Sequence, residues 1–103
     1  MSTAIPQRRA LVTGGSGDLG GAICRHLAAQ GRHVIVHANR NLARAEQVVA
    51  AIMADGGSAQ AAAFDVTDPQ ASSAALESLL EAGSIQILVN NAGIHDDAPM
   101  EIG

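Results

Sequence analysis

The residues best suited to chemistry in this sequence are the glycines of segment 13–20, which reads Thr-Gly-Gly-Ser-Gly-Asp-Leu-Gly. Glycine leaves main-chain N–H groups accessible, and a helix that begins directly after such a turn adds the positive end of its dipole. Together these features form a binding site for a phosphate or diphosphate group. The spacing therefore predicts a nucleotide diphosphate site, although a purely structural turn can have the same composition.

Few other side chains in the sequence could carry out chemistry. Lys, Tyr and Trp are absent, which excludes a Schiff-base lysine, a P-loop lysine and a phenolic general acid among these residues. The single cysteine, Cys24, has no apparent His partner in the pattern, and we expect a packed, unreactive thiol. The other candidates lack metal-ligand or catalytic spacing, so the sequence predicts no metal site. They are His26, His33, His37, the pair Ser72-Ser73, Ser84 and the polar run His95-Asp96-Asp97.

Length and charge narrow the class of protein. The 103 residues suffice for one small domain or for part of a larger one. Acidic residues outnumber basic ones by 10 to 6, so there is no basic surface for nucleic-acid phosphates or an anionic membrane. No apolar run approaches the roughly 18 residues of a membrane span, and the N-terminus has no signal-peptide core. We therefore expect a cytoplasmic protein that binds neither nucleic acid nor membrane.

Short apolar runs alternate with helical patterns along the chain. The runs are continuously apolar, which is typical of parallel strands covered on both faces. Asp68 followed by Pro69 is a strong helix start, because Asp caps the free N–H groups and Pro has no N–H at the first helical position. We expect strands at residues 10–13, 33–37, 59–65 and 85–89, and helices at residues 18–30, 41–55 and 69–82.

The apolar spacing within each helix predicts which side chains face the sheet. In the first helix the expected stripe is Leu19, Ile23 and Leu27. In the second it is Ala45, Val48, Val49, Ile52 and Met53, and in the third it is Leu76, Leu79 and Leu80.

The alternation of elements predicts an α/β protein, specifically the N-terminal βαβαβαβ half of a doubly wound parallel-sheet Rossmann fold. The glycine segment then lies at the carboxyl edge of the sheet, where open α/β sheets bind ligands. Nothing regular follows Asn90, so the fourth strand would have an uncovered apolar edge. We expect residues 1–103 to form a single partial domain that lacks a C-terminal catalytic half.

Three motifs at predicted strand ends resemble the short-chain dehydrogenase/reductase family. They are the glycine turn, the pair Asp65-Val66 after the third strand, and Asn-Asn-Ala-Gly at residues 90–93. The likeness extends from about residue 9 to about residue 94 and is greatest to bacterial 3-oxoacyl-[acyl-carrier-protein] reductases. It implies an NADPH-dependent oxidoreductase that acts on carrier-protein-linked or small carbonyl substrates in fatty acid synthesis, as a homo-oligomer.

The resemblance also implies which residues contact the NADP cofactor. Asn90 would brace the sheet rather than bind a ligand. The cofactor diphosphate and the ribose next to it would lie on Gly14, Ser16, Gly17, Leu19 and Gly20. The adenine would contact Asp65 and the main chain of Val66, and the nicotinamide-side ribose would contact Asn91, Ala92 and Gly93.

One position departs from the family pattern TGxxxGxG, because Asp18 stands where the middle glycine belongs. The chain instead fits TGxxGxxG through Gly14, Gly17 and Gly20, which is the spacing of the extended, sugar-nucleotide branch of the family. An epimerase or dehydratase fragment of that branch is therefore an alternative. We expect Asp18 to cap the helix with its carboxylate turned away from the cofactor, because it would repel a phosphate.

The segment after the second strand selects the nicotinamide cofactor. An NAD site has an acidic residue there, whereas NADP needs positive charge or neutral donors for its 2′-phosphate. Residues 37–40 read His-Ala-Asn-Arg and include no carboxylate. Asn39 and Arg40 can both donate hydrogen bonds, although Arg40 is equally compatible with a solvated loop. The sequence therefore predicts NADPH.

Reduction of a carbonyl also requires a proton donor and a group that stabilises the oxyanion. In the resembling family these are a Ser and a Tyr-x-x-x-Lys pair beyond the fourth strand, and neither Tyr nor Lys is present here. We therefore expect no catalytic residue and no activity from these 103 residues alone, which would bind cofactor at most. Two readings stay open: a truncated, non-catalytic dinucleotide-binding or interaction module, or one part of a longer polypeptide.

Overall fold

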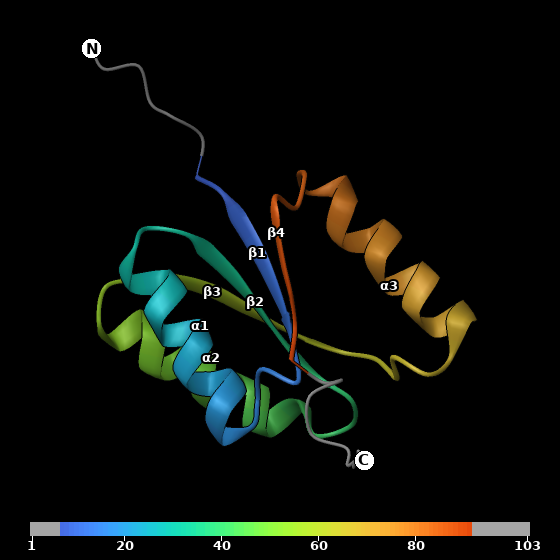
Figure 1. The fold of residues 1–103 in the computed structure, drawn as a ribbon, viewed down its shortest axis with the longest axis horizontal. Coiled ribbons are helices and arrows are strands. Elements are labelled where there is room, and N and C mark those ends of the chain that lie inside the picture. Colours follow the sequence, from blue (N-terminus) through green and yellow to red (C-terminus); the bar gives the residue numbers. More distant parts are fainter. Residues whose placement is uncertain (1–6, 92–103) are drawn as a thin grey trace, which may run out of the picture.

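Strands and helices alternate along the chain in the computed structural model, which describes residues 7–91 (Figure 1). The four strands form one parallel sheet in the order β3-β2-β1-β4. The predicted βαβαβαβ order is confirmed, and every expected boundary lies within about two residues of the observed one. The elements are β1 (Arg9–Thr13), α1 (Asp18–Ala29), β2 (His33–Ala38), α2 (Leu42–Ala54), β3 (Ser58–Ala63), α3 (Pro69–Glu81) and β4 (Ile87–Asn90).

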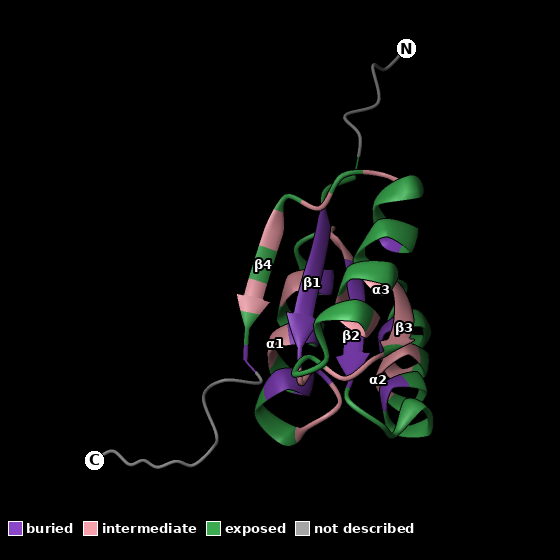
Figure 2. Cartoon of the chain, turned by 90° about the vertical axis from the view of Figure 1, so that its right-hand side faces the viewer, coloured by how far each residue is buried: buried purple, intermediate pink, exposed green. Residues whose placement is uncertain are grey.

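The two central strands are buried on both faces, as their continuous apolar character predicts (Figure 2). On one face, Val12 of β1 and Val36 of β2 pack against α1 and α2. On the other face, Leu11 and Ile35 pack with Leu79 of α3. Helices thus cover both faces of the sheet, and β1 lies in its interior between β2 and β4.

The starts of the three helices differ in one respect that matters for ligand binding. Asn41 caps α2 by accepting from Arg44 N at 3.2 Å, and Asp68 caps α3 by accepting from the N–H groups of two residues. The helix start predicted at Asp68-Pro69 is therefore confirmed. The capping position of α1 is occupied by Gly17, and no side chain of the described residues caps this helix. Its terminal N–H groups stay available for another acceptor.

The predicted apolar stripe of α1 is confirmed only in part. Ile23 and Leu27 are partly buried and pack against the core, whereas Leu19 is 56% exposed. The buried residues of the helix are small: Gly20, Gly21, Cys24 and Ala28. Apolar spacing indicates where large side chains lie but not how closely a helix approaches its neighbours.

The predicted stripes of α2 and α3 are only partly buried. Ile52 and Ala45 are in the core, whereas Met53 is 59% exposed. In α3 only Leu79 is buried, and Leu80 is 52% exposed. Leu88 of β4 is 66% exposed, and β4 pairs with β1 alone in the part of the chain that the structure describes. The expected uncovered edge at β4 is therefore present among these residues, and the assignment of a partial domain stays a prediction.

Neither a membrane-spanning helix nor a cluster of metal-binding side chains occurs among the described residues. Within residues 7–91, no helix has the length and apolar character that a bilayer span requires. The same residues contain no group of three or more His, Cys, Asp or Glu side chains placed to hold a metal ion.

Candidate functional site

The glycine turn connects the carboxyl end of β1 to the first turn of α1. Gly14 has a φ of 66°, which favours glycine, and its O accepts from Gly17 N at 3.2 Å. The first bond of helical spacing runs from Gly21 N to Gly17 O at 2.7 Å. The N–H groups of residues 18–20 therefore have no acceptor within the helix, and no side chain replaces one. This arrangement is suited to an anionic group, as the sequence predicts.

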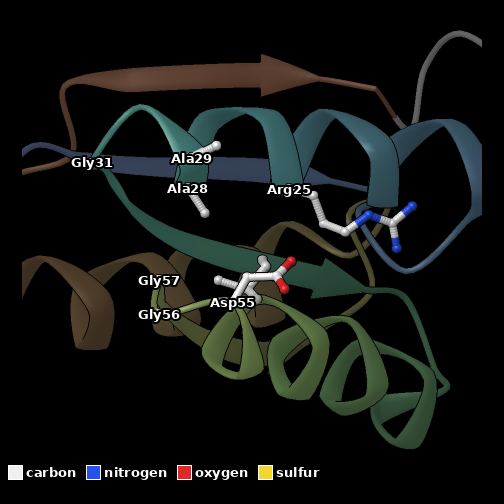
Figure 3. Close-up of a pocket in the computed structure, with 8 residues that line it drawn as sticks. Arg25, Ala28, Ala29, Gly31, Asp55, Gly56 and Gly57 are labelled. Atoms are coloured by element: carbon white, nitrogen blue, oxygen red, sulfur yellow. The ribbon is translucent and has the colours of Figure 1, made fainter.

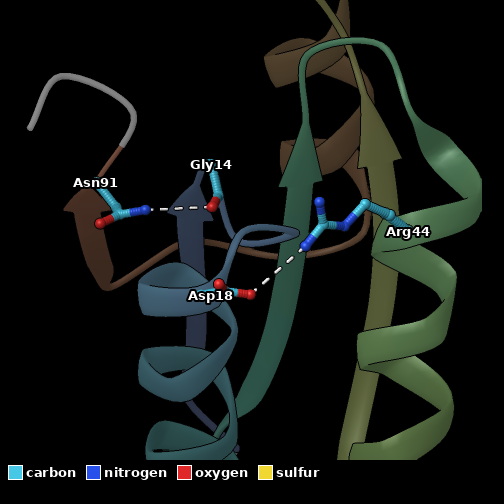
Figure 4. Close-up of polar contacts among 4 residues, drawn as sticks. All are labelled: Gly14, Asp18, Arg44 and Asn91. Carbon is cyan, nitrogen blue, oxygen red and sulfur yellow. Dashed lines mark hydrogen bonds and ion pairs between the residues drawn. The ribbon is translucent and has the colours of Figure 1, made fainter. Parts of the chain in front are cut away.

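The turn is braced by the residue that follows β4. Asn91 Nδ2 donates to Gly14 O at 3.1 Å (Figure 4). A Cβ at Gly20 would lie 2.2 Å from Gly14 O and 2.8 Å from Asn91 Nδ2. Only glycine therefore allows the start of α1 to lie this close to the turn. Asn91 is 3% exposed, and its Nδ2 is held against the turn. The ribose contact predicted for Asn91 stays a prediction.

Of the other three residues of the Asn-Asn-Ala-Gly motif, the structure describes Asn90 but not Ala92 and Gly93. Thr13 Oγ1 donates to Asn90 Oδ1 at 3.2 Å, which joins β1 to β4. This contact gives Asn90 the bracing position that the resemblance implies. Ala92 and Gly93, like the run at residues 95–97, lie outside the described residues, so their predicted roles are untested.

His37 holds the other side of the turn, and sequence reasoning missed it. Gly14 N donates to His37 Nδ1 at 3.0 Å, and His37 Nε2 donates to Phe64 O at 2.7 Å. The ring is fully buried, and this burial lowers the pKa of His37 below its ordinary value. The imidazole is therefore neutral at neutral pH. The available signal was a polar residue at the end of an apolar strand in a fold where that end meets the glycine turn.

Residues predicted for the adenine side gather where β2 and β3 end. Asn39 Oδ1 accepts from Val66 N at 3.2 Å, which links the two strand ends and leaves the Asn39 amide N–H groups for a ligand. Asp65 Oδ1 accepts from the Thr67 hydroxyl at 2.7 Å and from Thr67 N at 2.9 Å. These two hydrogen bonds lower the pKa of Asp65, so it is an ionised acceptor. Arg40 is exposed beside this group.

Asp18 does not cap α1, so that prediction is wrong. The backbone is already helical at Asp18, and the capping position falls on Gly17. The carboxylate instead points toward α2, where Oδ1 lies 3.6 Å from an Arg44 guanidinium nitrogen (Figure 4). This exposed pair adds little to stability, but Arg44 offsets the negative charge that Asp18 places beside the turn. An anion on the N–H groups of α1 would therefore meet less repulsion than the sequence alone indicates.

A cavity of about 330 Å³ opens beside this ion pair. Its lining comes from the start of α1 and from the facing side of α2, including Ser16, Gly17 and Arg44. Two of the predicted diphosphate residues thus border an open space that reaches two arginines, Arg25 and Arg44.

A second cavity, of about 300 Å³, lies between the C-terminal ends of α1 and α2 (Figure 3). It is at the amino edge of the sheet, away from the glycine turn, and its charged side chains are Arg25 and Asp55. None of the residues predicted to bind the cofactor lines it. The candidate site is therefore the glycine turn.

Cys24 packs behind the turn as an inert thiol, as predicted. It is fully buried against Gly15, and burial raises its pKa to about 12. We expect Cys24 of the folded protein not to react with a thiol-specific reagent at about pH 8, where an exposed cysteine reacts readily. Peptide mass mapping should show Cys24 labelled only after unfolding in denaturant. Fast labelling of Cys24 in the folded protein would contradict the burial.

Comparisons with known proteins agree with this geometry. A profile of the short chain dehydrogenase family matches residues 8–102. Gluconate 5-dehydrogenase of Gluconobacter oxydans is 41% identical over 96 residues, which cover 90% of this chain and 36% of that protein. A 3-oxoacyl-[acyl-carrier-protein] reductase of a Synechocystis strain is 40% identical over 96 residues, which cover 92% of this chain and 39% of that protein.

Solved structures give the same result. A metagenomic short-chain oxidoreductase in complex with NADP superposes with a TM-score of 0.80 at 35% identity, covering 84% of this chain and 39% of that one. The chain therefore spans less than two fifths of the length of each of these three proteins. The resemblance predicted from three short motifs is confirmed.

Proposed function

This chain belongs to the short chain dehydrogenase family, and on that premise we propose that it binds NADPH as the dinucleotide-binding part of an oxidoreductase. The observation that carries the proposal is the uncapped start of α1 behind the glycine turn, at the carboxyl edge of a parallel sheet. NADP in the complex of the metagenomic relative supports the same cofactor.

The residues present fit a dinucleotide. We propose that the N–H groups of residues 18–20, together with Gly14, Ser16 and Gly17, hold the diphosphate and its adjacent ribose. Asp65 would accept from the adenine amino group, with the main chain of Val66 beside it. Asn91, Ala92 and Gly93 would contact the nicotinamide-side ribose. When bound, NADPH supplies a hydride for a carbonyl carbon, and these residues bind and orient it.

The protein must also protonate the carbonyl oxygen, and residues 1–103 contain no Tyr or Lys for this task. We propose that the proton donor comes from outside these residues, in keeping with the longer relatives. The substrate would be a 3-oxoacyl group on a carrier protein, which the Synechocystis reductase supports. The gluconate dehydrogenase is similar to the same degree, so a panel containing both kinds of carbonyl compound is the appropriate assay. A cytoplasmic homo-oligomer remains the expected form of the enzyme.

We expect Arg40 to select NADPH over NADH. Replacing Arg40 with Ala should weaken binding of NADPH by about tenfold and leave NADH unchanged, because a charged hydrogen bond to the 2′-phosphate is lost. Isothermal titration of the full-length protein with each cofactor measures both values.

Arg8→Ala is the matched control, since Arg8 is an exposed arginine just before β1, at the opposite edge of the sheet from the site. Equal affinity of the unaltered protein for the two cofactors would remove the preference for NADPH. Binding of neither cofactor would overturn the proposed function itself.

A further inference from the structure

His37 contacts both halves of the proposed dinucleotide site. Its Nδ1 accepts from Gly14 N, and its main-chain O accepts from Ser16 N at 3.3 Å, so one residue holds two points of the glycine turn. On its other side, Nε2 donates to the carbonyl of Phe64, the residue directly before Asp65. The imidazole therefore lies between the turn proposed for the diphosphate and the strand end proposed for the adenine.

The hydrogen bonds of His37 determine where its proton lies. A main-chain N–H can only donate, so Nδ1 must be unprotonated to accept from Gly14. A main-chain carbonyl can only accept, so Nε2 must carry the hydrogen that faces Phe64. The ring has no exposed surface, and its centroid lies 4.3 Å from that of the Phe64 ring. Water therefore cannot replace either partner unless the ring moves.

We propose that His37 is a positioning residue for dinucleotide binding, an inference that rests on the proposed function. In its neutral form, protonated on Nε2, it fixes the glycine turn relative to the adenine end of the site. Because the side chain is buried, it acts through Gly14 and Phe64 and does not touch the cofactor.

The proposal predicts a loss of affinity in acid. Protonation would place a second N–H on Nδ1, 3.0 Å from Gly14 N, so two donors would face each other. Burial lowers the pKa of His37, so the ring stays neutral above its ordinary value of about 6.5 and affinity falls only below that pH. The other charged groups in the segments around the ring are exposed or partly exposed: Asp18, Arg40, Asp65 and Asp68.

Two substitutions of His37 each keep one of the two hydrogen bonds of the ring and remove the other. In His37→Asn the amide oxygen takes the place of Nδ1 and still accepts from Gly14, whereas in His37→Gln the amide nitrogen takes the place of Nε2 and leaves Gly14 N unpaired. At about pH 8 we expect His37→Asn, which gives up the hydrogen bond to Phe64 O, to bind NADP⁺ up to about threefold more weakly than the unaltered protein. His37→Gln and His37→Ala should bind about tenfold more weakly.

The pH profile tests the protonation step. Titration of the full-length proteins with NADP⁺ from about pH 8 downward, to below the pH at which NMR shows the His37 ring to become protonated, should show a further loss of at least about threefold in the unaltered protein relative to His37→Asn. The 2′-phosphate of the ligand titrates in both experiments, so the difference isolates His37. His33→Asn is the control on the same strand, because His33 bonds to Ser58 and Gln60 at the amino edge of the sheet. It should keep the profile of the unaltered protein.

Either of two results would overturn the proposal: His37→Gln binds as the unaltered protein does, or His37→Asn and the unaltered protein lose affinity in parallel. If the unaltered protein binds no dinucleotide, the proposed function fails separately. Nitrogen NMR of the ligand-free protein then decides the role of His37. Nε2 should be protonated and Nδ1 should accept a hydrogen bond, and the Gly14 amide signal should move far more in His37→Gln than in His37→Asn. A protonated Nδ1 at about pH 8 would refute the positioning role.

Discussion

Replacing Gly20 with alanine is expected to lower the free energy of unfolding by about 3 kcal/mol, because overpacking adds to the loss of a hydrogen bond. The new Cβ would lie 2.2 Å from Gly14 O and 2.8 Å from the Cα of Gly15. Both are main-chain atoms, so no side chain can rotate to make room. The first turn of α1 must move away from β1, and the contact between Gly14 and Asn91 is then lost. Denaturant unfolding of the full-length protein measures the change.

Gly21→Ala is the matched control in the same helix. A Cβ at Gly21 would meet Gly15 O and Val48 Cγ2, each at 3.6 Å, which is ordinary contact. Alanine also has the higher helix propensity, so this variant should be as stable as the unaltered protein or more stable by up to about 1 kcal/mol. If Gly20→Ala unfolds at the same denaturant concentration as Gly21→Ala, the close approach of α1 to the turn is wrong.

Replacing Asn91 with aspartate is expected to lower the free energy of unfolding by about 3 kcal/mol at neutral pH. The new carboxylate is a buried charge, and the partner of Asn91, Gly14 O, cannot donate a hydrogen bond to it. The side chain keeps its shape but exchanges a donor for an acceptor. An ionised carboxylate would face Gly14 O, and the site is only 3% exposed. Thermal or denaturant unfolding of the full-length protein gives the magnitude.

The cost should decrease as the pH is lowered. Burial raises the pKa of a carboxyl group, and its protonated form can donate to Gly14 O as the amide does. Asn91→Ala is the comparison, because it removes the donor without adding charge and should cost about 1 to 2 kcal/mol at every pH. Equal losses in the two variants, with no dependence on pH, would contradict the buried contact.

The elements and their order could be predicted because their signals are local. Asp68 and Pro69 begin α3, and the continuous apolar runs of β1 and β2 identify buried parallel strands. The burial of α1 could not be predicted in the same way. Whether Leu19 or Gly20 faces the sheet depends on the distance between helix and sheet, which residues far apart in the chain determine.

Only part of the candidate site could be predicted from the sequence, because the rest also depends on residues far apart in the chain. Gly14, Ser16 and Gly17 are adjacent in sequence, and their pattern indicates a turn for an anion. The roles of His37 and Asn91 arise from hydrogen bonds that span 23 and 77 residues of chain. For Asn91 nothing in the local composition indicates a partner at Gly14, and for His37 the one signal is a polar residue at the end of an apolar strand. The placement of Asp18 beside Arg44 is likewise a property of the packed helices.

The anchoring of Gly14 on both sides has a consequence for protein engineering. The amide N–H of Gly14 donates to His37 of β2, and its carbonyl accepts from Asn91 at the end of β4. Neither partner belongs to the glycine segment itself. Transplanting residues 13–20 onto an unrelated scaffold would copy the sequence motif without its supports. The smallest transferable unit is β1 with the turn and α1, plus a histidine and an asparagine supplied by the two strands that flank β1.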